Sequence, residues 1–270
     1  MTDNDRIIHI EGVHNIRDLG GLTGLDGRRI KKNLLIRSSR LVLIQEDGLE
    51  FLKSINLSTI IDMRTTYEAT KRPDPELEGV TYHRIGVLSE EPNEMGATYS
   101  MLARSKNEDE ALVNVLISGF DMSHVYMDFV EQPFAIQGMG QALKLIAAQP
   151  EGEAILFHCN GGKDRTGTFT VFLLTILGVD KDTIMDDFEM TNEYFADEIE
   201  RMKNVARSMT DDQKVIDGMQ DIAGVSRANM DKAMESIIAK YGSVMDYIRN
   251  VLGVTDEEIN EIRRKYLEEI

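Results

Sequence analysis

The stretch AILFHCNGGKDRTGTFTVFLLTILG, residues Ala154–Gly178, decides the fold that the sequence predicts. Its first part, Ala154–Phe157, is a short apolar run of the kind that forms a buried strand. A glycine-rich loop follows, and from about Arg165 a long apolar run has the length of a buried helix. A buried strand that leads through such a loop into a buried helix is typical of α/β proteins, whose sites lie beyond the carboxyl ends of strands.

The chain before this stretch extends the α/β pattern. Further β-branched or apolar runs predict strands at Leu34–Arg37, Thr59–Met63 and Thr81–Val87. Helical patterns lie between the predicted strands, for example at Asp47–Ile55 and Ile136–Ala148. We therefore expect a mostly parallel central sheet that is flanked by helices on both faces.

No Pro-rich or Ser/Gly-rich linker divides the sequence, so we expect one domain over residues 1–270. Its α/β core covers about residues 1–180, with a helical insertion near residues 89–132. Residues 181–270 look entirely helical and are expected to form an extension that covers the core. Within this extension the pair Thr255 and Glu258 fits a capping box that opens a last helix, which makes the C-terminal part helical to its end.

The composition excludes several classes of protein. The chain has 47 Asp and Glu residues against 30 Lys and Arg residues, a net charge of −17, which disfavours a general nucleic-acid binder. A single cysteine excludes an internal disulfide and a multi-cysteine zinc site. The N-terminus lacks a signal-peptide pattern, and the longest apolar run is too short to cross a bilayer. We therefore expect a cytoplasmic protein without stable membrane insertion.

The loop after the last predicted strand carries the candidate chemistry. Cys159 and Arg165 are separated by five residues, the spacing of a cysteine-dependent phosphatase loop. Such a loop can wrap its backbone N–H groups around one phosphate, and the N-terminus of the following helix adds partial positive charge. Gly161 and Gly162 permit the backbone angles that point successive amides inward. Arg165 can bind two phosphoryl oxygens as a fork, and the same field favours a nucleophilic thiolate.

The loop string HCNGGKDRTG resembles the HCxxGKDRTG signature of the bacterial atypical protein tyrosine and phosphoinositide phosphatases. Other segments resemble elements of that family: Asn15–Gly21 (NIRDLGG), Leu35–Leu41 (LIRSSRL), Ile60–Arg64 (IIDMR, with Met63 in place of Leu) and the C-terminal AKYGSVMDYIRNVLGVT. The resemblance covers nearly the whole chain. It implies a cysteine-phosphatase fold with a helical cover over the pocket. It also implies activity on phosphotyrosine, and in some members on phosphoserine, phosphothreonine or phosphoinositides.

The resemblance implies roles for the loop residues. Cys159 would attack phosphorus, Arg165 would bind the phosphoryl oxygens, and Asp164 would act as the general acid. Lys163 would add positive charge at the mouth of the pocket. The remaining phosphate-binding residues would be Asn160, Gly161, Gly162 and Thr166. The chain has no tryptophan and no Trp-Pro-Asp loop, and an upstream carboxylate such as Asp128 competes for the role of the acid.

Three residues beside the cysteine have both a structural and a functional interpretation. His158 is expected to brace the loop by hydrogen bonds rather than to act as a base. Thr166 either steadies the thiolate through its hydroxyl or has only the structural role of a residue at the start of the helix. Asp62, at the end of a predicted strand, either supports the loop arginine and the acid chemistry or forms a salt bridge with Arg17 or Arg64.

We therefore expect an enzyme that hydrolyses phosphomonoesters in two steps through a phosphocysteine intermediate. The histidines His14, His83 and His124 are scattered, and we assign neither a metal nor an organic cofactor. The expected partners are phosphotyrosine proteins, proteins with phosphoserine or phosphothreonine, or phosphoinositides. The alternative from another class is an inactive phosphate-recognising module of the same fold, which an intact Cys159, Asp164 and Arg165 disfavour. A sulfur-transfer or arsenate-reducing enzyme is a third possibility, but arsenate reduction usually needs further cysteines.

Overall fold

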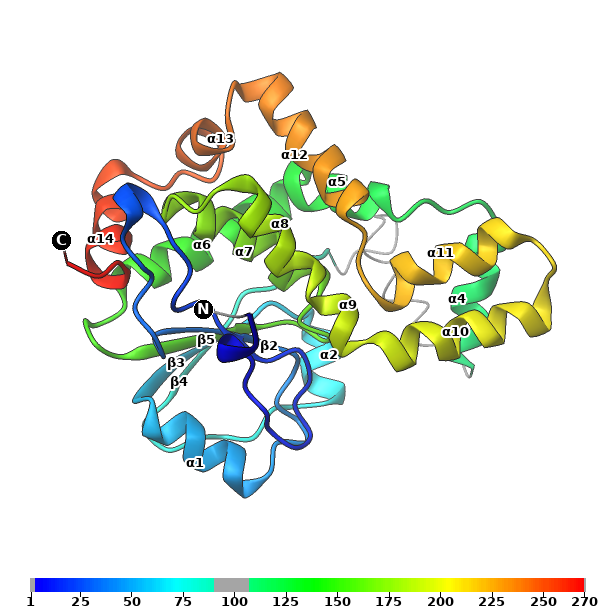
Figure 1. Cartoon of the computed structure of the whole chain (residues 1–270), viewed down its shortest axis with the longest axis horizontal. Coiled ribbons are helices and arrows are strands. Elements are labelled where there is room, and N and C mark those ends of the chain that lie inside the picture. The colour runs from blue at the N-terminus through cyan, green and yellow to red at the C-terminus, as the bar shows by residue number, and fades with distance from the viewer. Residues whose placement is uncertain (1–2, 90–106, 270) are drawn as a thin grey trace.

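A five-stranded sheet lies at the centre of the structure, a computed structural model that describes residues 3–89 and 107–269 (Figure 1). The strand order is β1-β2-β5-β3-β4. The strands are β1 (Arg17–Asp18), β2 (Leu35–Ser38), β3 (Leu57–Asp62), β4 (Thr81–Arg84) and β5 (Ala154–His158). All neighbours pair in parallel except β1, which pairs with β2 in the antiparallel direction. The predicted mostly parallel sheet is confirmed.

Strand β5 occupies the middle of the sheet, and both of its faces are buried. Ile155 and Phe157 belong to one apolar core, whereas Ala154 and Leu156 belong to a second core. Successive side chains of a strand point to opposite faces, so a continuous apolar run fits a strand that is covered on both sides. Because β2, β3 and β5 are parallel, their carboxyl ends meet at one edge of the sheet. The residues that follow β5 therefore lie between those that follow β2 and those that follow β3.

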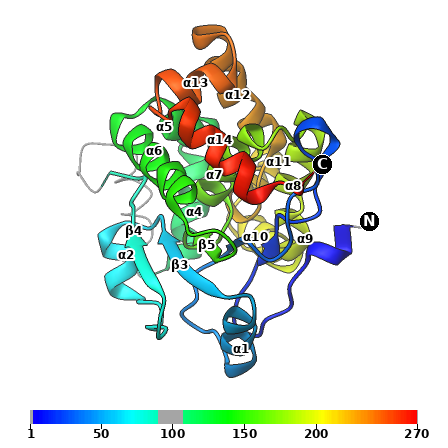
Figure 2. The same cartoon turned by 90° about the vertical axis from the view of Figure 1, so that its left-hand side faces the viewer.

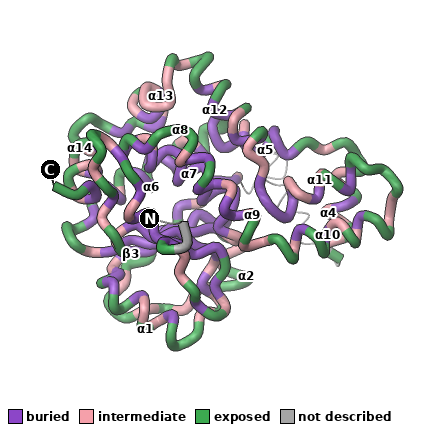
Figure 3. Tube along the Cα trace, viewed as in Figure 1, coloured by how far each residue is buried: buried purple, intermediate pink, exposed green. Residues whose placement is uncertain are grey.

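Helices cover both faces of the sheet. Helix α1 (Glu46–Ser54) lies below the sheet in Figure 1, and α6 (Pro133–Ala148) and α7 (Asp164–Ile176) lie above it. The view in Figure 2 confirms the two layers, with α14 (Asp256–Tyr266) beside α6. Strand β5 and helix α7 form a largely buried centre in Figure 3. The expectation of helices on both faces is therefore confirmed.

The remaining helices lie on both sides of the sheet's covering layer (Figure 1). Those before β5 are α2 (Thr66–Lys71), α4 (Glu108–Ile117) and α5 (Ser123–Glu131). Those after α7 are α8 (Lys181–Glu189), α9 (Thr191–Tyr194), α10 (Ala196–Met209), α11 (Gln213–Ala223), α12 (Arg227–Tyr241), α13 (Val244–Asn250) and α14. Helices α13 and α14 lie at the left in Figure 1. Helices α4, α10 and α11 pack against one another and project to the right in Figure 1; we call them the outer lobe. The predicted all-helical C-terminal part is confirmed, including the capping box of Thr255 and Glu258.

Two details of the sheet differ from the sequence prediction. Strand β4 ends at Arg84 rather than at Val87, because its partner β3 ends at Asp62, whose carbonyl oxygen accepts a last hydrogen bond from the Ile85 N–H. Strand β1 was not predicted, since two polar residues carry no periodic signal. Of the predicted insertion, residues 90–106 lie outside the described residues, and the part that follows contains α4 and α5. The assignment of residues 1–270 to one domain stays a prediction.

In the described part of the chain, no helix combines the length and the apolar character that a membrane span requires. Among the described residues the longest helix is α6, with 16 residues. A span of the hydrocarbon core takes roughly 20 apolar residues.

A buried carboxylate on α8 ties together distant parts of the chain. Asp187 Oδ1 accepts hydrogen bonds from Arg6 at 2.7 Å and Arg17 at 3.1 Å, and its Oδ2 accepts one from Arg37 at 2.9 Å. Burial alone would raise the pKa of Asp187, but the three guanidinium groups hold it well below its usual value. Burial and the neighbouring Arg17 lower the pKa of Arg37 to about 9, although Asp187 opposes that shift. The N-terminal segment, β1 and β2 are thereby all joined to α8.

We expect Asp187→Asn to destabilise the protein by about 3–5 kcal/mol, because three buried guanidinium groups lose their counter-charge. The measurement is the free energy of unfolding in urea. The matched control is Asp186→Asn on the same helix, whose carboxylate is 69% exposed and pairs with Arg227. An exposed pair contributes at most about 1 kcal/mol. Equal losses in the two variants would contradict the structural role of Asp187.

Candidate active site

The loop that follows β5 begins at Cys159, which is 2% exposed, and ends where α7 begins at Asp164. Gly162 has a φ of +65°, and a Cβ atom at this position would lie 2.3 Å from the Ser38 carbonyl oxygen. Only glycine fits both conditions, as the sequence predicts for Gly162. The same prediction is wrong for Gly161, which does not belong to the glycines with positive φ. The loop therefore needs one left-handed glycine rather than two.

Carbonyl groups on the outer side of the loop are held by side chains from the first two strands. The Gly162 oxygen accepts hydrogen bonds from Asn15 Nδ2 and Arg37 Nη2, each at 2.8 Å. The Asn160 oxygen accepts one from the Arg40 backbone N–H at 3.1 Å. In a trans peptide unit the C=O and N–H groups point in opposite directions, so outward carbonyls direct the following amides inward. Concave sets of inward amides of this kind bind anions in proteins.

Arg165, in the first turn of α7, is oriented by a carboxylate from another strand connection. Its Nη1 and Nη2 donate to Glu68 Oε2 at 2.7 Å and Oε1 at 2.8 Å. Burial alone would raise the pKa of Glu68, but Arg165 and the hydrogen bonds from Thr65 lower it to about 2. Glu68 is therefore ionised at neutral pH, and it fixes the plane of the guanidinium group. The sequence analysis missed this partner, although Thr65-x-x-Glu68 has the pattern of a capping box, which the structure contains.

Asp164, at the start of α7, has a partner from the helical cover. Its Oδ1 accepts a hydrogen bond of 2.7 Å from the Tyr126 hydroxyl of α5. The competing carboxylate Asp128 lies on the same helix and accepts a hydrogen bond from Gln132 at an exposed position. Of the two carboxylates, Asp164 is the one that belongs to the loop–helix junction.

Lys163 joins the loop to the outer lobe. Its ammonium group donates to the carbonyl oxygens of Ile222 at 2.7 Å and of Ala223 and Gly224 at 3.0 Å each, at the C-terminal end of α11. The ammonium also lies 5.8 Å from the centre of the Phe195 ring. The C-terminus of a helix attracts cations because its last carbonyls are unpaired. The structure thus places the charge of Lys163 against the cover instead of at an open mouth.

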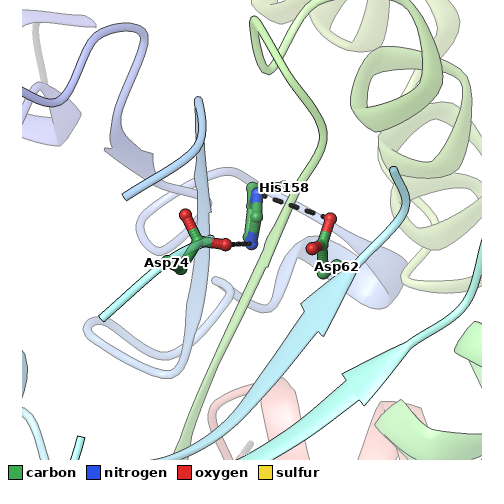
Figure 4. A group of neighbouring side chains, drawn as sticks. All are labelled: Asp62, Asp74 and His158. Carbon is green, nitrogen blue, oxygen red and sulfur yellow. Dashed lines mark ion pairs between the residues drawn. The ribbon is translucent and has the colours of Figure 1, made fainter. Parts of the chain in front are cut away.

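Behind the loop, His158 lies between two carboxylates (Figure 4). Its Nδ1 lies 3.0 Å from the Cys159 carbonyl oxygen, and its Nε2 lies 3.3 Å from Asp74 Oδ2. Asp62 Oδ1 lies 4.0 Å from Nδ1. These contacts agree with the interpretation of His158 as a brace of the loop. Asp62 accepts three hydrogen bonds from the Arg64 guanidinium, so its structural interpretation as a salt-bridge partner of Arg64 is the one that the contacts support.

Asp62, Asp74 and His158 together have the residue types of a metal site, and their ligand atoms lie within 4.8 Å of one another. Arg64 already pairs with both carboxylates. Burial alone would lower the pKa of His158, but the two carboxylates raise it overall. Because Arg64 occupies both carboxylates and His158 lies between them, the group fits an ion-pair network rather than a metal centre.

The other predicted residues lie in or beside the loop. Asn160 Oδ1 accepts a hydrogen bond of 2.7 Å from Arg40 Nη1 on its outer side. Thr166 is buried in the first turn of α7, and its hydroxyl has no hydrogen-bond partner among the described residues. Arg37 lies close enough to Cys159 that a thiolate there would favour the charged guanidinium. The structure therefore gathers Cys159, Asp164 and Arg165 at one edge of the sheet, under the helical cover.

A cysteine at the end of a central strand, an amide cradle and an arginine in the first turn of the next helix are features of the cysteine-dependent phosphatases. The sequence matches the tyrosine phosphatase family over residues 8–268, and the chain belongs to that family. It is a phosphatase of the protein tyrosine phosphatase type. The predicted family and class of enzyme are confirmed.

Three relatives resemble the chain over most of its length. A putative tyrosine-protein phosphatase of Cupriavidus necator is 30% identical and covers 94% of this chain and 86% of the relative. The triple specificity protein phosphatase PtpB of Mycobacterium tuberculosis is 22% identical and covers 94% and 96%, respectively. A tyrosine-protein phosphatase of Nostoc commune is 27% identical and covers 87% and 74%.

We expect Asp74→Asn to lower the pKa of His158, because one of the two carboxylates that favour the imidazolium loses its charge. In the wild type, the contribution of His158 to stability is present below its ordinary pKa of 6.5 and is lost as the pH rises through the raised value. The measurement is a pH titration of the His158 ring by NMR. Asp180→Asn, at the exposed N-cap of α8, is the control and leaves the titration unchanged. The same His158 titration in the Asp74 variant would contradict the assigned network.

Proposed function

We propose that the chain hydrolyses phosphomonoesters of tyrosine-phosphorylated proteins through a covalent phosphocysteine intermediate. The observation that carries this proposal is the cradle between β5 and α7, with Cys159 at its start and the Glu68-oriented Arg165 at its end. The amides, the N-terminus of α7 and Arg165 all favour negative charge at the same place. They would stabilise both the thiolate and the phosphoryl oxygens.

In the first step the Cys159 thiolate attacks phosphorus, and the bond from phosphorus to the ester oxygen breaks. Asp164 donates its proton to the departing oxygen, so that a neutral alcohol or phenol leaves. Arg165 and the amides bind the equatorial oxygens throughout. The contact with Glu68 fixes the plane of the Arg165 guanidinium group.

In the second step water attacks the phosphocysteine and gives its proton to the Asp164 carboxylate. The sulfur–phosphorus bond breaks, the thiolate is regenerated and inorganic phosphate is released. The hydrogen bond from Tyr126 to Asp164 supports this assignment, because it orients the carboxyl group from the cover side. Lys163 would act indirectly, by tying the loop to α11.

The alternative of an inactive phosphate-recognising module is less well supported. Cys159, Asp164 and Arg165 are all present, and Glu68 holds the arginine in an oriented position. A cytoplasmic location stays part of the proposal, as does the absence of any cofactor from the reaction. The triple specificity in the name of PtpB belongs to that relative. Phosphotyrosine is the substrate group that we propose for this chain.

We expect Cys159→Ser to abolish turnover of para-nitrophenyl phosphate but to retain binding of inorganic phosphate, because the amides and Arg165 are unchanged. Arg165→Lys should lower kcat/KM by about 10²–10³-fold, since a lysine cannot form the two-pronged contact. Steady-state kinetics and calorimetric titration with phosphate measure the two effects. Arg264→Lys, at a surface position that is 51% exposed, is the control. Clear steady-state activity of the serine variant would refute the nucleophile assignment.

The identity of the general acid can be tested by comparing substrates with poor and good leaving groups. A good leaving group departs without its proton, so Asp164→Asn should slow phenyl phosphate by about 10²–10⁴-fold and an activated aryl phosphate far less. Asp128→Asn serves as the matched control and should show no dependence on the leaving group. A steep dependence in the Asp128 variant, with a uniform loss in the Asp164 variant, would assign the acid to Asp128.

A further inference from the structure

A small hollow of about 140 Å³ lies against the outer side of the phosphate-binding loop. One wall is the loop itself, at Asn160 and Gly161, and the opposite wall includes Ser39 and Arg40, which follow β2. Because β2 and β5 are adjacent and parallel, both walls stand at the carboxyl edge of the sheet. A group bound in the hollow would therefore lie next to the cradle that the proposed reaction uses.

Arg40 gives the hollow a positive charge that has no carboxylate at ion-pair distance among the described residues, although Asp74 and Glu68 act on it from further away. Its Nη1 donates to Asn160 Oδ1 at 2.7 Å, and it forms no ion pair within residues 3–89 and 107–269. Arg72, at the end of α2, lies near enough to act on Arg40 electrostatically and likewise has no ion pair in this part of the chain. Burial and the nearby Arg72 and Arg64 lower the pKa of Arg40, and Asp74 and Glu68 offset only part of that shift.

The lack of a direct ion pair sets Arg40 apart from the buried arginines. The chain carries a net charge of −17, and the other buried arginines Arg6, Arg17, Arg37, Arg64 and Arg165 all pair with carboxylates. A half-buried guanidinium group in an acidic protein has many possible partners among its own residues. The planar fork of Arg40 is therefore held beside the loop in a form suited to an anion from outside, such as a phosphate or a carboxylate.

The rim of the hollow favours a peptide as the carrier of that anion. Leu43 is 61% exposed, and its apolar side chain lines the hollow together with the ring of Phe195. Gly12 and the exposed His14 also line the hollow. Apolar surface next to a cation suits a polypeptide, whose backbone and side chains contact the rim while one acidic side chain reaches the arginine.

We propose that this hollow binds a second anionic side chain of a phosphotyrosine peptide, with Arg40 as its principal ligand. The anion is a phosphate or a carboxylate that lies close in sequence to the phosphotyrosine. This inference rests on the proposed function, since it names the substrate class that the same site prefers. Arg40 contacts the substrate but takes no part in bond making or breaking, so it determines specificity.

The test compares phosphotyrosine peptides that carry glutamine, glutamate or phosphoserine at each of the two positions before and after the phosphotyrosine. For the wild type, kcat/KM should be about tenfold higher with an anionic residue at one of these positions than with glutamine, as for a charge-assisted contact. Arg40→Gln should remove this preference, and Arg40→Lys should retain part of it. Lys53→Gln, at an exposed position on α1, makes the same change of net charge and should leave the preference unchanged.

The decisive quantity is the ratio of kcat/KM for the anionic peptide to kcat/KM for the glutamine peptide. Because Arg40 also contacts Asn160, its substitution can slow all peptides alike, but only the loss of a subsite changes the ratio. An unchanged preference in Arg40→Gln would overturn the inference while leaving the proposed function intact. The choice of a peptide would be overturned if Arg40→Gln removed a preference for soluble phosphatidylinositol bisphosphate over the monophosphate but left the preference among peptides unchanged. Turnover of no phosphopeptide by the wild type would instead overturn the proposed function itself.

Discussion

The geometry of the site depends on the neutralisation of buried arginines by Asp187. Arg37 donates to this carboxylate and, through its other terminal nitrogen, to the Gly162 carbonyl oxygen of the loop. Arg17 pairs with the same carboxylate and also hydrogen-bonds to Asn15, which holds the loop in turn. Buried guanidinium groups without a counter-charge would be too costly to place there. The loop is therefore held in shape by α8, which follows α7 in the chain.

This dependence changes the meaning of the predicted division into a core over residues 1–180 and an extension beyond it. Asp187 lies in the extension, and so do the carbonyl groups that bind Lys163. A chain that ended at residue 180 would contain every strand and the loop sequence, but Arg6, Arg17 and Arg37 would lack their common partner. The helices after α7 are thus part of the foundation of the site as well as its cover.

The sequence predicts best those features that are local along the chain. Residues Ala154–Gly178 have a continuous apolar run, a glycine-rich turn and a second apolar run, and each is a signal that needs no partner. The pair of Arg165 and Glu68 could not be found in this way, because the two residues lie 97 positions apart. The chain also offers many other carboxylates as possible partners for Arg165, and many other basic residues as possible partners for Glu68. The end of β4 was missed for a related reason, since the length of β3 sets it. The contact of the Lys163 ammonium group with the helical cover could not be predicted either, because its acceptor carbonyls belong to a helix some 60 residues later.

The contact of Lys163 with α11 makes the loop sensitive to the register of a distant helix. The three acceptor carbonyls belong to consecutive residues, Ile222 to Gly224, at the point where α11 ends. Insertion of one residue into an α-helix advances its end by about 1.5 Å and turns it by about 100°. Such an insertion in α11 would rotate these carbonyls away from the Lys163 ammonium group. Lys163 directly precedes Asp164 and Arg165 in the chain, so the loss would be felt next to the proposed catalytic residues. The outer lobe can therefore vary freely in the side chains on its surface, but not in the length of this helix.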